Sequence, residues 1–429
     1  MPGSDHGGRH LVTAHQDVRP VDPAAEGQRS ASAFWRYWTA STISNVGDAI
    51  TTVALPLVAV SVLHASSLQV SFLTAAQYAA WIAIGLPAGV IVQRLPLRGT
   101  QVAMDLVRAF ALLSVPVAAA FDVLHLTQLV LVALVMGLAT VVFDVGNSTF
   151  LPSVVRKEEL TARNSLTSAS ASATQLGGPS LGGVLVQLLG GAATLVFDVV
   201  SYFVSAVLLR SLPRPAPVRP EAGGESMVRQ IKDGWRFVTH HTVLRPCVMA
   251  ATLTNFTCGA FMALLPVFLV RTLDASAGLV GVLIATEGLG SLLGATLTPR
   301  IARRIGSART ILLSTLSGAC VVLLMPLAGS GWGLLLFAAG NLCFGASVVV
   351  LSILTRTHRQ TVTPPELLPR VMATVRFISW GAVPFGALTA GTAAGALGNR
   401  EALWLICGLA FLTPLAVWTS AIRRTRDLT

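Results

Sequence analysis

Long apolar stretches recur along the whole chain, and they constrain its fold more than any other feature of the sequence. A helix needs about 20 consecutive apolar residues to cross the hydrocarbon core of a bilayer. Measured against that length, twelve segments qualify as membrane-spanning helices: 37–62, 69–93, 100–121, 126–148, 164–188, 192–211, 246–270, 277–299, 308–328, 332–355, 371–395 and 401–421. We therefore expect an all-α membrane protein with twelve transmembrane helices.

The composition supports this expectation through its shortage of charge. Only 11% of the residues are charged and 53% are hydrophobic, whereas a soluble domain carries about 25% charged residues. The high hydrophobicity also excludes a disordered chain. A net charge of +11 would be compatible with nucleic-acid binding. The positions of the basic residues along the chain decide between nucleic-acid binding and a membrane topology.

The basic residues alternate with the expected spans. Of the 30 Lys and Arg, 26 lie in the two tails and in every second loop, whereas the opposite loops carry only Arg271 and Arg400. Cytoplasmic loops are enriched in Lys and Arg, so both termini of a multi-pass protein of the cell membrane are expected in the cytoplasm. The positive surplus then faces anionic lipid head groups, and no nucleic-acid partner is implied.

The sequence repeats itself at an offset of about 205–210 residues. Asn45 precedes Pro56 in the first span as Asn255 precedes Pro266 in the seventh. An offset of six spans keeps both halves in the same orientation, as parallel repeats are. The expected organisation is a disordered cytoplasmic tail (1–36), a six-helix half (37–211), a linker (212–245), a second six-helix half (246–421) and a second cytoplasmic tail (422–429).

The linker contains a short segment with helical periodicity. Met227, Ile231, Trp235 and Val238 are spaced as on one helix face, with Lys and Arg between them. This pattern predicts an amphipathic helix on the cytoplasmic membrane interface. The alternative is a plain solvated linker.

Chemistry-bearing motifs are scarce. The five cysteines fall in or at the edges of the expected spans and lack metal-ligand spacing, so we expect no metal site. Phosphate-binding and zinc-protease motifs are also missing, and no nucleophile stands with a base. We therefore expect neither a catalytic site nor a cofactor, and the chain is not expected to be an enzyme.

Several segments resemble the major facilitator superfamily, specifically its drug and siderophore exporter-like branch that includes macrolide efflux proteins. The resemblance covers residues 34–420 and is carried by SNVGDAITTVALPL, GLPAGVIVQRLPLRG, FDVGNSTFLPSVV and VRFISWGAVPFGAL. It implies a monomeric secondary active transporter that exports a small amphipathic molecule, such as a drug or secondary metabolite, by proton antiport and alternating access. Its partners would be the small-molecule substrate, protons and membrane lipids. The alternatives are a siderophore or peptide exporter of the same fold, or a non-transporting membrane sensor.

The loop after the second span is similar to the superfamily motif that latches the two halves together. The motif residues are Gly89, Gln93, Arg94 and Arg98, with Gln93 where the family carries an acid. Since an amide forms hydrogen bonds but carries no charge, the resemblance implies a weakened latch. In a second interpretation, Arg94 and Arg98 have no role in a latch and serve only to keep this loop on the cytoplasmic side of the membrane.

The fifth span is similar to the core of the family's antiporter motif. The matching residues are Gly178, Pro179, Gly182 and Gly183. Small residues let helices approach closely, and the proline removes one helical hydrogen bond. The resemblance favours export by exchange; the alternative is helix packing alone.

Ionisable residues inside membrane spans are costly, so they are candidates for function. Asp48 and Glu287 lie deepest and break the internal repeat, and we expect them to couple protons or bind a cationic group of the substrate. A carboxyl group removed from water favours its neutral form, which allows it to load and release a proton. The alternative is hydrogen bonding between helices.

The remaining intramembrane acids receive other interpretations. Asp105 and Arg108 are three residues apart and are expected to form a structural ion pair. Asp144 lies near the cytoplasmic end of its span and is also a candidate for proton coupling or substrate binding. Asp198 is expected near the outer end, within reach of water.

Three more residues complete the candidate site. Arg376 is expected either to act as a counter-ion for Glu287 or for an anionic substrate, or to extend towards the surface, and its spacing allows cation–π contact with Trp380. Asn45 and Asn255 are related by the repeat and are expected to form hydrogen bonds in the central cavity.

Overall fold

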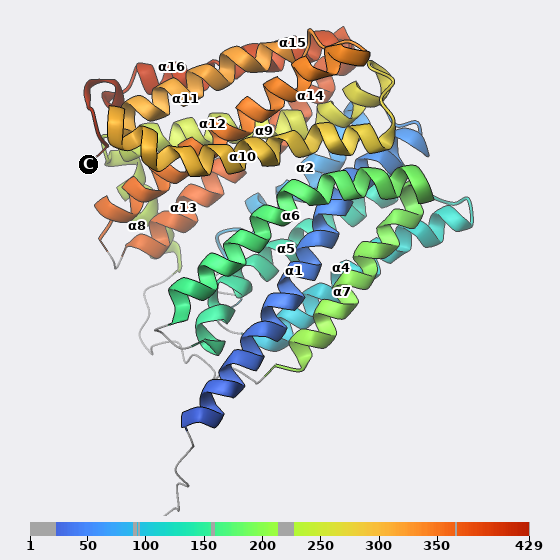
Figure 1. Cartoon of the computed structure of the whole chain (residues 1–429), viewed down its shortest axis with the longest axis horizontal. Helices are drawn as coiled ribbons and strands as arrows, with labels where there is room; N and C mark the ends of the chain where they lie inside the picture. The colour runs from blue at the N-terminus through green and yellow to red at the C-terminus, as the bar shows by residue number, and fades with distance from the viewer. Residues whose placement is uncertain are drawn as a thin grey trace, which may run out of the picture.

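The computed structural model describes residues 23–88, 92, 95–155, 159–212, 227–364 and 367–428, and this part of the chain consists of α-helices and short 3₁₀ helices without strands. The helices fall into two bundles (Figure 1). The first half contains α1 (Pro23–Ser61), α2 (Ser67–Ile84), α4 (Leu97–Ala120), α5 (Leu126–Val154), α6 (Leu160–Leu189) and α7 (Gly191–Arg210).

The linker helix α8 (Met227–His240) leads into the second half. That half contains α9 (Leu244–Arg271), α10 (Ala277–Ile305), α11 (Ser307–Val321), η2 (Val322–Leu324), η3 (Gly331–Gly333), α12 (Leu334–Val362), α13 (Leu368–Trp380), α14 (Val383–Leu397), α15 (Asn399–Leu409), α16 (Leu412–Trp418) and η4 (Ala421–Arg424).

Ten helical segments of the described chain are long and apolar enough to cross a membrane. The expected all-α membrane fold is confirmed, but the count of twelve spans is not. The two expected segments that fall short are 69–93 and 164–188, which correspond to α2 and α6. Both helices nevertheless lie inside the bundle, where α2 packs on α5 and α14, and α6 packs on α1 and α10.

Two expected spans of the second half are broken by short turns. Residues 381–382 separate α13 from α14, and residues 410–411 separate α15 from α16. Pro384 and Pro414 follow these turns. Because proline lacks the N–H that would bond to the preceding turn, each one removes a helical hydrogen bond at the break.

The internal repeat is visible in the backbone of the loops. His64, after α1, and Asp274, after α9, both adopt positive φ, at 51° and 50°. The amide of Ala65 donates to Ala59 O, and the amide of Ala275 donates to Leu269 O, both at 2.9 Å. Identical turns 210 positions apart confirm that the two halves repeat one structural unit.

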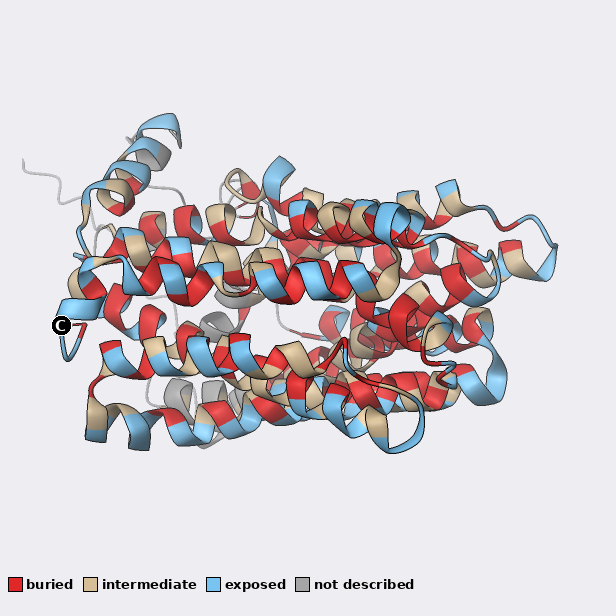
Figure 2. Cartoon of the chain, turned by 90° about the horizontal axis from the view of Figure 1, so that it is seen from above, coloured by how far each residue is buried: buried red, intermediate tan, exposed pale blue. Residues whose placement is uncertain are grey.

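An extensive apolar core joins the two halves at one end of the molecule. A smaller cluster around Trp81 also includes Trp380 of the second half. A large buried cluster at the end opposite the chain termini combines residues of both halves, including Val58 and Phe268. At the terminal end, separate clusters belong to the first half, around Phe150, and to the second half, around Ile311 and Val371. Buried residues accordingly run through the centre of each bundle (Figure 2).

Hydrogen bonds reinforce the junction at the end opposite the termini. The Arg271 guanidinium donates to Ala65 O at 2.5 Å, and Ser67 Oγ donates to Asn399 Oδ1 at 2.6 Å. The Gly278 amide donates to Gln187 Oε1 at 3.0 Å. Each of these bonds joins the first half to the second, so the halves are held together around this end.

The first described helix begins before the expected first span. Residues 1–22 lie outside the described residues, but α1 begins at Pro23, so the expectation of disorder is wrong for residues 23–36. Phe34 is 1% exposed and packs in the cluster around Phe150, with the Arg163 guanidinium 4.3 Å from its ring centroid. These contacts hold the N-terminal part of the candidate span Ala31–Ser61 against the rest of the first half.

The linker helix and the C-terminal segment both dock on the second half. Val238 of α8 is buried against α13, and Asp233 accepts a 3.1 Å ion-pair contact from Arg370. The expected interfacial helix therefore has a protein partner as well. In the last residues, Leu428 is buried, and Asp427 accepts a hydrogen bond from the Ser307 amide at the start of α11. The C-terminal segment is therefore packed against the bundle.

The closest backbone approach between the halves occurs where α6 crosses α10. A Cβ atom on Gly183 would lie 2.5 Å from Ala277 O and 2.8 Å from the Gly281 Cα atom. The same atom on Gly177, two turns earlier in α6, would meet nothing within 4 Å. Gly183 is therefore required by helix contact, and Gly177 is not.

We predict that Gly183→Ala lowers the melting temperature of the purified protein, because the added methyl group forces α6 away from α10. Gly177→Ala is the matched control, since it gains the same helix propensity of up to about 1 kcal/mol without a clash. Thermal unfolding in detergent measures both variants. Equal melting temperatures for the two would contradict the assigned contact.

Candidate functional site

A polar network lies between α1, α4 and α7, at mid-depth of the first half. Asp48 of α1 accepts a hydrogen bond from the Tyr202 hydroxyl of α7, and its Oδ2 lies 3.6 Å from an Arg108 nitrogen of α4. Arg108 is 1% exposed, whereas the Asp48 side chain is 39% exposed. The network therefore combines a buried guanidinium, that of Arg108, with a partly exposed carboxylate, that of Asp48.

Arg108 is held on several sides. It forms an ion pair with Asp105 on its own helix, and the second Asp105 oxygen accepts a hydrogen bond from Ser205 Oγ at 2.6 Å. The guanidinium carbon also lies 4.2 Å from the Phe143 ring centroid and 4.5 Å from that of Tyr202. Aromatic faces attract cations, so Arg108 is enclosed by two carboxylates and two rings.

Asp198 of α7 extends the network. Its carboxylate accepts hydrogen bonds from Thr51 Oγ1 at 2.5 Å and from Ser201 Oγ at 2.9 Å. The residue is fully buried, so the expectation that it reaches water near the outer end of its span is wrong. Asp198 points across to α1, where Gly47 leaves room for its side chain.

The charges of this network do not balance. Asp48, Asp105 and Asp198 are three carboxyl groups, and Arg108 is the cation that contacts two of them. A charge held away from water is costly unless it is paired. The arrangement can therefore lower its energy by binding a proton or a cation.

A second cluster lies between the halves and is built around Arg376. The Arg376 guanidinium carbon of α13 lies 4.7 Å from the Trp81 ring centroid of α2 and 5.4 Å from that of Trp380. The two indole centroids are 5.1 Å apart. Asp144 of α5 interacts electrostatically with Arg376 and with Arg108.

Tyr78 connects this cluster to Glu287. Its ring centroid lies 5.9 Å from that of Trp380. The titratable groups that act electrostatically on its hydroxyl are Cys258 of α9, Glu287 of α10 and Asp144. Acids from both halves therefore act on this residue through their charge, without a hydrogen bond or ion pair to it, and no ion pair joins Glu287 to Arg376 in the described part of the chain.

The two asparagines do not occupy equivalent environments. Asn255 Nδ2 donates to Ala251 O at 2.9 Å within α9. Asn45 is half-buried and lies one turn before Asp48 on α1. The sequence repeat therefore relates their positions but not their contacts.

The glycine motif of α6 packs against two helices. A Cβ atom on Gly178 or Gly182 would meet Ala49 or Ile50 of α1, and one on Gly183 would meet α10. The carbonyl of Pro179 lies opposite Gly281 of α10. The motif therefore lies at the junction of α1 with the second half.

Of the latch residues, only Arg98 can be placed, since Gly89, Gln93 and Arg94 lie outside the described residues. Arg98 donates to Leu212 O at 2.7 Å and to Arg210 O at 3.3 Å. The two acceptors lie at and just beyond the C-terminal end of α7, where carbonyl groups attract cations. In this structure Arg98 therefore contacts its own half.

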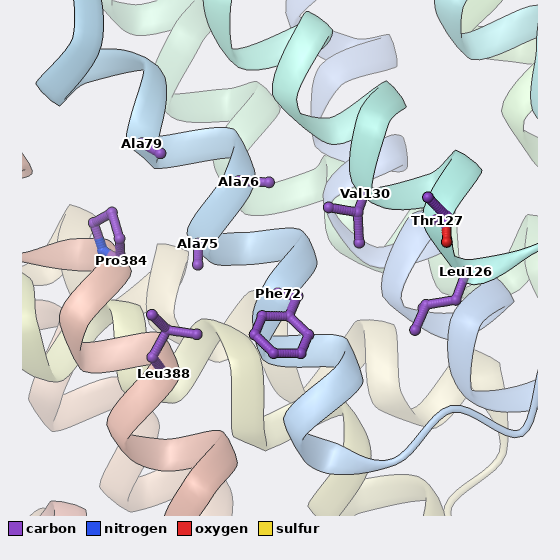
Figure 3. A pocket seen from close by; sticks show the side chains of 9 residues that line it. All are labelled: Phe72, Ala75, Ala76, Ala79, Leu126, Thr127, Val130, Pro384 and Leu388. Carbon is purple, nitrogen blue, oxygen red and sulfur yellow. The ribbon is translucent and has the colours of Figure 1, made fainter.

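An apolar groove of about 460 Å³ opens where α2, α5 and α14 meet (Figure 3). Its lining side chains come from both halves and include one hydroxyl: Phe72, Ala75, Ala76, Ala79, Leu126, Thr127, Val130, Pro384 and Leu388. The groove suits an acyl chain or the apolar part of an amphipathic molecule. Within the described ranges, no group of three His, Cys, Asp or Glu side chains could hold a metal ion.

Several of these residues were not singled out from the sequence. Ser201, Tyr202 and Ser205 follow Asp198 on one face of α7 at helical spacing, and this polar stripe on an apolar helix is a readable signal. Tyr78 and Trp81 carried no such signal, because aromatic residues are common in any apolar helix.

Comparison with known sequences gives a consistent result. The family described as transmembrane secretion effector matches residues 29–428. The MFS-type transporter YvqJ of Bacillus subtilis is 26% identical over 70% of this chain and 71% of its own length. The multidrug efflux pump Tap of Mycolicibacterium fortuitum is 24% identical over 91% of this chain and 95% of its own length.

Two further similarities concern transporters with named substrates. The enterobactin exporter EntS of Escherichia coli is 26% identical over 51% of this chain and 51% of its own length. The crystal structure of the nucleoside transporter NupG superposes with a TM-score of 0.75 at 11% identity, covering 90% of this chain and 98% of NupG. At that identity the superposition shows the fold alone.

We predict that Arg108→Leu destabilises the protein by about 3–5 kcal/mol, because it leaves the carboxylate of Asp105 buried without its cation. Arg309→Leu, at an exposed position, is the matched control and should cost little. Denaturation in mixed micelles of increasing SDS fraction measures the free energy of unfolding. A cost for Arg108→Leu no larger than that of the control would contradict the structural importance of the network.

Proposed function

Because this chain belongs to the transmembrane secretion effector family of the major facilitator transporters, we propose that it exports a small amphipathic molecule from the cytoplasm in exchange for protons. Its substrate would be a drug or secondary metabolite. The multidrug efflux pump among its relatives supports this direction and this class.

The arrangement of the halves supports alternating access. The apolar core and the three hydrogen bonds between the halves lie at the end opposite the termini. The excess of Lys and Arg at the terminal end supports a cytoplasmic position for that end in the cell membrane. The two bundles would then rock about their junction, and a substrate would enter from the cytoplasm.

The polar network of α1, α4 and α7 is the observation that carries the proton-coupling proposal. It places three carboxyl groups around one buried guanidinium, and Asp48 is the member with an exposed side chain. Asp48 would accept a proton from the aqueous side while Tyr202 and Arg108 hold its carboxylate in place. Neutralising Asp48 weakens its attraction to Arg108, and this would change the packing of α1 on α4.

Glu287 would perform the corresponding task in the second half. It lies on α10, the helix that packs on α6 of the first half. Tyr78 of α2 is within its electrostatic reach, so a change in its charge acts across the junction. Proton binding at Glu287 and movement of the halves are thereby linked.

Siderophore export is the second candidate, and the match to an enterobactin exporter favours it. That match covers half of the chain, whereas the match to the multidrug efflux pump covers nearly all of it. A non-transporting sensor of the same fold is a third candidate. The sensor would bind ligand without moving it.

A susceptibility panel identifies the substrate class. Host cells with and without the protein are exposed to antibiotics, dyes and iron-loaded siderophores, with and without a protonophore. We expect resistance to at least one amphipathic compound, lost when the protonophore is present. Siderophore secretion without compound resistance would favour the second candidate.

We predict that Asp48→Asn and Glu287→Gln each reduce pH-driven efflux of that compound from proteoliposomes to the level of empty vesicles. The reason is that an amide cannot exchange a proton. Glu401→Gln, an exposed acid at the start of α15, is the matched control and should transport as the unmodified protein does.

Retention of the wild-type rate in both amide variants would overturn the proton-coupling proposal. Ligand binding without flux in the unmodified protein would support the sensor instead. Melting temperatures of the variants establish that each one is folded, so that a lost rate reports on mechanism.

A further inference from the structure

Arg376 lies between aromatic side chains of the two halves. Its guanidinium carbon is 4.7 Å from the centroid of Trp81 in the first half and 5.4 Å from that of Trp380 in the second. Trp81 is 5% exposed, whereas Arg376 itself is exposed. Trp81 is therefore part of the packed interior, Trp380 is half-buried, and Arg376 is accessible to a ligand.

Acids complete the site around the aromatic faces. Asp144 interacts electrostatically with Arg376, and Tyr78, which packs against Trp380, interacts with both Asp144 and Glu287. Aromatic faces with nearby carboxylates are the features that bind organic cations in proteins. Trp81, Trp380 and Asp144 supply such aromatic faces and a carboxylate. The guanidinium of Arg376 takes the position that a bound organic cation would take.

The charge inside the membrane layer favours a cation as the ligand. Away from the ends of the twelve expected spans, the acids are Asp48, Asp105, Asp144, Asp198 and Glu287, and the bases are Arg108 and Arg376. Arg108 is enclosed by Asp48 and Asp105 in its own half. An anion bound at Arg376 would therefore face uncompensated carboxylates, whereas a cation that replaces Arg376 would keep their charge balanced.

We infer that the site formed by Trp81, Trp380, Tyr78 and Asp144 binds an organic cation, and that Arg376 is a tethered occupant which the ligand displaces. That this ligand is the transported substrate rests on the proposed function. Displacement has a mechanical consequence, because Arg376 lies on α13 and its partners Trp81 and Asp144 lie on α2 and α5. Ligand binding removes a contact between the halves and so favours the state in which they have moved apart.

Equilibrium dialysis of the purified full-length protein tests this inference with two probes of the same shape and opposite charge. Tetraphenylphosphonium is the cation, and tetraphenylborate is the anion. We expect saturable binding of the cation, corrected for partition into empty micelles, and no saturable binding of the anion. Saturable binding of tetraphenylborate alone would overturn the inference and make Arg376 an anion receptor.

Variants identify the site. Trp380→Ala should weaken binding of tetraphenylphosphonium by about 2- to 30-fold, the range expected for loss of one cation–π contact. Arg376→Gln should strengthen it by about 10-fold, since a ligand that competes with an occupant gains affinity when the occupant is removed. Arg423→Gln is the matched control, because Arg423 lies 5.0 Å from the Trp418 ring centroid on the surface, and it should change nothing.

A double variant separates displacement from simple electrostatics. If Arg376 acts by occupying the tryptophan site, the gain from Arg376→Gln disappears in the Trp380→Ala background. A gain that persists in full would show that the lost positive charge alone is responsible and would overturn the tethered-occupant inference. Unchanged or weaker binding in Arg376→Gln would overturn it as well.

The binding measurement needs neither a proton gradient nor transport. Its result therefore tests the binding site separately from the proposed export function. If the cation binds as described and no compound is exported by proteoliposomes, the export proposal is wrong and the binding site stands. If proton-driven export is observed and tetraphenylphosphonium does not bind, the inference is wrong and the export proposal stands.

Discussion

The cost of placing a charge in the apolar interior of a helical bundle governs the organisation of this protein. Arg108 is 1% exposed, and it is accommodated because Asp48, Asp105 and two aromatic rings surround it. Those partners come from α1, α4, α5 and α7, so one buried cation fixes the relative positions of four helices. The first half is therefore organised around a polar centre within an apolar shell.

The contact between the two halves differs at the two ends of the molecule. Apolar packing is continuous across the halves at the end opposite the termini, where Val58 and Phe268 lie in one cluster. At the terminal end each half has its own clusters. Between these regions lie the groups that contact across the junction, with Arg376 against Trp81 as the clearest case. A structure built in this way can hinge at one end, because the contacts at mid-depth can be replaced by those of a ligand.

Local features of the sequence predicted local features of the structure. The spacing of Asp105 and Arg108 is enough to anticipate their contact, because residues three apart share a helix face. Repeated motifs anticipated the repeat that the turns at His64 and Asp274 display. The direction of Asp198 could not be anticipated, because its burial depends on Thr51 of a distant helix. The helical residues 23–36 were missed for a similar reason, since Phe34 is buried by α5 and not by its own segment.

The sequence by itself determined that this is a multi-pass helical membrane protein with two related halves. Hydropathy and charge distribution are properties of single segments, and the bilayer imposes the same length and the same charge bias on each of them. Only the tertiary structure decided which intramembrane charges meet. Asp48 joins Arg108, and Arg376 contacts Trp81 of the other half, and neither of these contacts is encoded by spacing along the chain. Such contacts depend on how whole helices pack, and that packing is set by the combined surfaces of all their neighbours.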